Sequence, residues 1–132
     1  METVNIVQTT AQLNVKESCI DNATFNNVKL TGSIFIDVAM DKVKISNANI
    51  SDLEIEGAQL GGAYIHNVGM PRKGHPMYKP DAKMRPLKFE DCMLNGSIIT
   101  NCNLAGVAIT DCNLKGMTIN GILVEELLRN WG

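Results

Sequence analysis

The chain has 132 residues, of which 45% are hydrophobic and 20% charged, and its net charge is −2. This length fits one domain, and the composition is typical of a folded protein rather than a disordered one. The small net charge argues against chain-wide binding of nucleic acid, and no apolar run reaches the roughly 18 residues that cross a bilayer.

Residues 1–12 contain no basic stretch followed by an apolar one, so they do not read as a secretory signal. We expect them to cap the repeats that follow. Four cysteines in a chain without such a signal indicate free thiols and a reducing, cytoplasmic setting.

A five-residue period runs through residues 13–70 and returns in residues 87–121. Every fifth residue from Val15 to Met70 is large and apolar, and so is every fifth residue from Phe89 to Ile119. These are twelve centres in the first run and seven in the second. The residue two positions before each centre is uncharged and most often small.

The residue two positions after each centre is the third element of the pattern. It favours turns or tolerates positive φ in all cases but Lys42. The positions are Asn22, Asn27, Gly32, Asp37, Lys42, Asn47, Asp52, Gly57, Gly62, Asn67, Asp91, Gly96, Asn101, Gly106, Asp111, Gly116 and Gly121. Short extended segments that each end in a corner predict an all-β solenoid, with the centres and the small residues inside.

"CNLAG" (102–106), "CNLKG" (112–116) and "ANISD" (48–52) show the repeat most clearly. The pattern resembles the pentapeptide-repeat family, often written A(D/N)Lxx, over residues 13–70 and 87–121. The resemblance implies a right-handed quadrilateral β-helix with four repeats per coil and about 4–5 coils. Phe89 would then stack in the column of Val15, Phe35 and Ile55, and Ile50 would be an interior residue.

An inserted loop, residues 71–86, separates the two runs and contains all four prolines, which cannot donate to a strand ladder. Residues 71–88, called the basic segment below, hold six basic side chains and one acidic one, a net of +5. The rest of the chain has six basic and thirteen acidic residues, a net of −7. A boundary between two small domains at the loop is the weaker alternative, because short repeat runs need neighbours.

Two interpretations of the basic segment remain open. Either it docks onto the acidic remainder of its own chain, or it binds an acidic partner. Long loops on regular scaffolds often have such binding roles. The candidate partner-binding residues are Arg72, Lys73, His75, Tyr78, Lys79, Lys83 and Arg85.

Residues 122–132 predict a short amphipathic α-helix that caps the coil. Glu125 and Glu126 lie early and Arg129 late, as the helix dipole prefers. The resemblance also implies a dimer, because related proteins of this family dimerise end to end through such caps; we therefore expect a homodimer, with a monomer as the alternative. The candidate dimer contacts are Leu123, Leu127, Leu128 and Trp131.

The sequence offers no set of residues for catalysis, a metal or a cofactor. Cys92, Cys102 and Cys112 fall at small inward positions and are expected to be buried like small hydrophobic residues. A disulfide between coils is disfavoured by the reducing compartment. His66 is expected to point outward, and His75 lies in the loop.

We therefore predict a non-enzymatic rigid scaffold or protein-interaction module, with the basic segment as its contact surface and no membrane or direct nucleic-acid binding. The alternative is a modulator of a DNA topoisomerase (gyrase), because the quinolone-resistance branch of the family has a similar rod, loop and helical cap. This chain is shorter, however, and outward lysines dilute the negative charge that a DNA mimic needs. They are Lys16, Lys29, Lys44 and Lys115.

Overall fold

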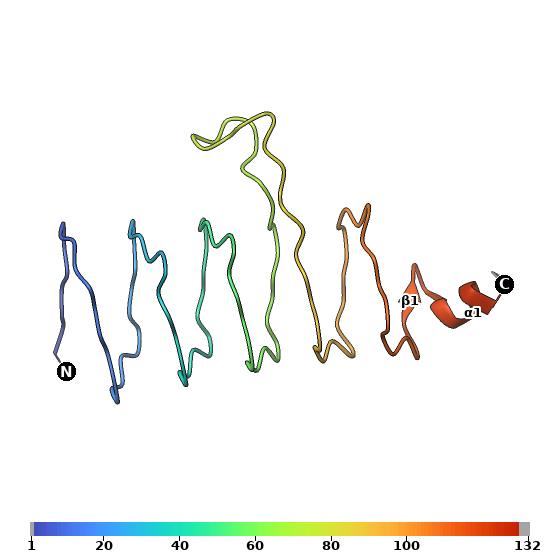
Figure 1. Ribbon diagram of the computed structural model, residues 1–132, viewed down its shortest axis with the longest axis horizontal. Coiled ribbons are helices and arrows are strands. Elements are labelled where there is room, and N and C mark those ends of the chain that lie inside the picture. The colour runs from blue at the N-terminus through green and yellow to red at the C-terminus, as the bar shows by residue number, and fades with distance from the viewer. Residues whose placement is uncertain (1, 130–132) are drawn as a thin grey trace. The chain divides into compact units, whose positions relative to one another are not determined.

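The computed structural model describes residues 2–129. The helices and strands of this part of the chain are β1 (Thr118–Ile119), β2 (Ile122–Leu123) and α1 (Val124–Arg129). Figure 1 labels β1 and α1 near the C-terminal end. Contacts divide the chain into two units, Met1–Leu60 and Gly61–Gly132. Within each unit, extended segments alternate with bends and turns.

The corner positions are confirmed. All seventeen residues that the sequence assigns to corners have positive φ, including Lys42 at 64°. Glu17, two residues after Val15, has a φ of 50° and adds one more corner at the N-terminal end of the series. A lysine or glutamate in this region of φ costs about 1–2 kcal/mol relative to glycine, which explains why glycine, asparagine and aspartate dominate these positions.

The corners are of two kinds that alternate. At one kind, the carbonyl of the centre accepts a hydrogen bond from the N–H three residues later, as from Val107 to Leu104 at 3.0 Å. Gly106, the third residue of this turn, has a φ of 79°, which matches a type II turn. A Cβ at Gly106 would meet nothing within 4 Å, so backbone conformation rather than space favours glycine there. At the other kind, the chain makes a simple bend, as at Asn101 with a φ of 55°.

The predicted β-helix is wrong. A solenoid requires each coil to pair with the next through backbone hydrogen bonds. Between residues 2 and 129, however, the only strands are the two-residue β1 and β2, and their two-stranded antiparallel sheet does not close. The other extended segments make too few contacts with residues far apart in the sequence to stack as coils. The repeat specifies the corners, which are local, but local turns do not by themselves bring successive segments into a ladder.

The predicted interior is also wrong, for the same reason. Without a ladder to close the coil, the centres stay accessible to solvent; Leu114 alone among them is half-buried. Phe89 is 61% exposed and does not stack in a column with Val15, Phe35 and Ile55. Ile50 is 50% exposed, so a charge at this position would not enter an interior.

A β-hairpin near the C-terminus leads into the one buried hydrophobic side chain among residues 2–129, that of Val124 in α1. β1 and β2 are antiparallel, with Thr118 opposite Leu123 and Ile119 opposite Ile122. Asn120 and Gly121 form the two-residue connection, with φ values of 49° and 80°. Two positive φ values match the type I′ turn that Asn-Gly favours. The hairpin leads directly into Val124, which is only 7% exposed.

The predicted C-terminal helix is present but begins at Val124, because Ile122 and Leu123 are in β2. The Val124 N–H donates to the Met117 carbonyl at 2.9 Å, and the Gly116 N–H donates to Oε1 of Glu125 at 3.0 Å. These two bonds join α1 to the last repeat corner. The helix does not cap a coil, since the structure has no closed coil for it to cover.

Candidate partner-binding segment

Three consecutive β-turns shape the inserted loop. The N–H of His75 donates to the carbonyl of Arg72 at 3.0 Å, that of Tyr78 to His75 at 2.9 Å, and that of Ala82 to Lys79 at 3.2 Å. Pro76 and Pro80 are the second residues of the latter two turns, where their fixed φ suits a type I or II turn. The prolines that predicted a loop therefore also position its turns.

His75 has a local role that the sequence did not reveal. Its Nδ1 accepts a hydrogen bond from the N–H of Met77 at 3.0 Å, so the proton of the neutral ring is on Nε2. The residue also takes part in two of the backbone turns. A histidine directly before a proline at the start of a turn is the signal that could have suggested this bond. His75, one of the candidate partner-binding residues, thus helps to hold the backbone of the loop in its turns.

The candidate partner-binding residues are all exposed. Lys73 lies within the first turn, and Lys79 begins the third. Lys83 and Arg85 follow the turns in an extended stretch. Apolar side chains accompany these cations, since Met77 is 65%, Met84 43% and Tyr78 39% exposed. The turns thus present a mixed basic and apolar surface to solvent; its binding role remains a prediction.

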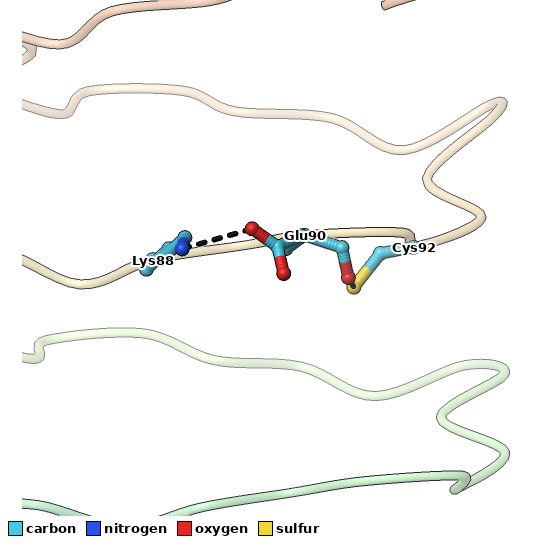
Figure 2. Close-up of polar contacts among 3 residues, drawn as sticks. All are labelled: Lys88, Glu90 and Cys92. Atoms are coloured by element: carbon cyan, nitrogen blue, oxygen red, sulfur yellow. Dashed lines mark hydrogen bonds and ion pairs between the residues drawn. The ribbon is translucent and has the colours of Figure 1, made fainter.

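An ion pair marks the end of the basic segment. Nζ of Lys88 lies 2.8 Å from Oε2 of Glu90, two residues along the same extended stretch, as Figure 2 shows. Both side chains are well exposed. The hydrogen bond and the charge of Lys88 lower the pKa of Glu90, and Glu90 raises the pKa of Lys88 in the same two ways.

This ion pair predicts a pH dependence with two limits. Because the pKa of Glu90 is lowered, its ionised carboxylate stabilises the folded state at pH values above the ordinary glutamate range. This stabilisation is lost as pH falls through the lowered pKa. Because the pKa of Lys88 is raised, the stabilisation from its protonated amine is lost only as pH rises through the raised pKa. We expect Lys88→Ala to raise the Glu90 pKa in an NMR titration of the carboxyl carbon. Lys115→Ala should leave it unchanged; an unaltered Glu90 pKa in Lys88→Ala would contradict the pairing.

The cysteines do not lie where the sequence placed them. Cys92, Cys102 and Cys112 are exposed rather than buried, because no coil closes over their positions. Each thiol donates to the carbonyl two residues earlier, at 3.2, 3.2 and 3.1 Å respectively. Figure 2 shows Cys92 beside Glu90. All four cysteines are free, and within the described part of the chain no three His, Cys, Asp or Glu side chains gather to hold a metal ion.

His66 is exposed, as predicted, but it has a neighbour that the sequence reading overlooked. Its ring stacks on Tyr64, with centroids 4.0 Å apart and planes 14° from parallel. Residues two apart in an extended segment face the same side, so this spacing is the signal that could have identified the stack.

The candidate dimer contacts belong to the C-terminal element. Leu123 in β2 is 38% exposed, and Leu127 and Leu128 in α1 are 44% and 55% exposed. Trp131 lies outside the described residues. The role of these side chains in a dimer remains a prediction.

Comparison of the chain with protein-family models, with curated proteins and with solved structures finds no match. The resemblance to pentapeptide repeats therefore remains a prediction from the sequence pattern. Among residues 2–129, no helix has both the length and the apolar character needed to cross a membrane.

Proposed function

We propose that the protein is a non-enzymatic interaction module whose basic segment binds an acidic partner in the cytoplasm. The observation that supports this most is the concentration of six basic side chains and one acidic side chain in residues 71–88, on a loop of three turns. The rest of the chain has the opposite net charge. Such a concentration of one sign attracts and orients partners of the other sign.

The turns support the proposal in a second way. Ordering a flexible loop on binding costs free energy, and turns that exist before binding reduce that cost. The prolines and the His75–Met77 hydrogen bond limit the conformations of residues 75–82. The topoisomerase hypothesis has no comparable support, because it required a β-helical rod, which the structure lacks.

A charge-removal experiment tests the proposal. The loop variant replaces Arg72, Lys73, Lys79, Lys83 and Arg85 with Ser. Binding to fluorescent polyglutamate is measured by anisotropy at low salt. Exposed ion pairs contribute roughly 0.2–1 kcal/mol each, so losing five should weaken binding on the order of tenfold or more.

The matched control removes the same number of charges elsewhere, by replacing Lys16, Lys29, Lys42, Lys44 and Lys115 with Ser. We expect it to bind polyglutamate far better than the loop variant does. Equal losses in the two variants would mean that only net charge matters, and the proposed role of the basic segment would then be wrong.

A further inference from the structure

The structure leaves apolar side chains uncovered along both units. Val124 is the one buried hydrophobic residue among residues 2–129, whereas side chains such as Phe25 and Phe35 are 57% and 58% exposed. Exposed apolar surface on this scale marks a surface that associates with something. Any copy of this chain presents the same surface to any other copy.

The acidic residues outside the basic segment include a dense group in the first unit. Glu54 and Glu56 lie two residues apart in one extended segment and are exposed. Alternate residues of an extended segment face the same side, about 7 Å apart. Leu53 and Ile55, each 58% exposed, alternate with them. The carboxylates of Glu54 and Glu56 therefore lie on one side of this stretch, and the apolar Leu53 and Ile55 lie on the other.

We propose that the acidic partner of the basic segment is a second copy of this chain. The basic segment of one copy, with a net of +5, would lie on the acidic repeats of the other, where the chain outside that segment has a net of −7. Two copies related by a two-fold axis make this contact twice, which closes the assembly as a dimer. The inference rests on the proposed function, because it requires the basic segment to bind an acidic surface.

Sedimentation equilibrium of the full chain over a range of concentrations tests the inference. We expect twice the 14.4 kDa mass of one chain at low salt. Association should weaken as salt rises from about 0.01 to 1 M, since the Debye length falls from about 30 to 3 Å. A mass of 14.4 kDa at every concentration in low salt would overturn the inference.

Charge reversal identifies the contact. The loop-reversed variant carries Lys79→Glu and Lys83→Glu, and the body-reversed variant carries Glu54→Lys and Glu56→Lys. Each alone should associate at least about tenfold more weakly than the native chain, because like charges then face each other. An equimolar mixture of the two should regain association, since both contacts of the mixed dimer then pair opposite charges. A mixture no stronger than its components would overturn the inference.

Two further outcomes separate this inference from its alternatives. If Leu128→Glu abolishes association and the charge reversals do not, the C-terminal helix makes the contact and the inference is wrong. If the native chain is monomeric but its basic segment still binds polyglutamate, the inference fails while the proposed function stands. If it is monomeric and binds no polyglutamate, both fail.

Discussion

Replacing Val124 with Asp should open the C-terminal hairpin and helix. Val124 is 7% exposed, and burying a valine side chain contributes about 1.5–3 kcal/mol. A carboxylate in its place would lose this contribution and would also resist burial. Amide hydrogen exchange reports the result, because the N–H of residue 124 donates to the Met117 carbonyl. Its protection should fall by roughly tenfold to a hundredfold, which corresponds to the same free energy.

Val107→Asp is the matched control, since Val107 is 59% exposed and receives the same substitution. Its effect on the exchange of the residue 124 amide should be negligible, because surface substitutions usually change stability by less than about 0.5 kcal/mol. Equal protection in Val124→Asp and in the native chain would show that the side chain of Val124 does not hold this region together.

Gly121→Val should disrupt the same region through the backbone. Gly121 has a φ of 80° in the two-residue connection between β1 and β2. A β-branched residue is strained at such a φ, and the strain costs about 1–3 kcal/mol. The hairpin should then lose its pairing, and the N–H of Gly116, which donates to Glu125, should exchange faster.

Gly61→Val provides the control for this substitution. Neither glycine has an atom within 4 Å of where a Cβ would lie, but Gly61 does not have positive φ. The two variants therefore differ in backbone strain and not in crowding. If both leave the exchange of the Gly116 amide unchanged, the turn at Asn120 and Gly121 does not determine the hairpin.

Corner positions could be predicted from the sequence because a corner depends on a few adjacent residues. The centre, the residue after it and the Gly, Asn or Asp that follows are enough to predict a corner. Lys42 has a φ of 64° without being one of these residue types, so its position in the repeat also contributes. The solenoid could not be predicted in the same way. Pairing between segments involves residues far apart in the chain, and a repeat of apolar centres is compatible with paired and unpaired segments alike.

The hairpin was predictable but was missed. Asn120-Gly121 is a strong hairpin signal, yet the five-residue period assigned Gly121 to one more corner and everything after it to a helix. In the loop, the prolines predicted only a break in the strand pattern; the turns at Pro76 and Pro80 go beyond that prediction, although the fixed φ of proline suits the second turn position. The His75 ring bond and the Tyr64–His66 stack depend on side-chain conformations, which the repeat pattern does not specify.

The alternation of the two corners restricts how this gene can lengthen or shorten. In residues 91–116, Asp or Asn stands at every bend and glycine at every hydrogen-bonded turn, so the true unit is ten residues. Because each corner depends on its own few residues, deleting five residues within this stretch would remove one corner and bring two corners of the same kind together. Deleting or duplicating ten residues would keep the two kinds alternating. Length variants of this stretch that keep its alternation should therefore differ by thirty nucleotides rather than fifteen.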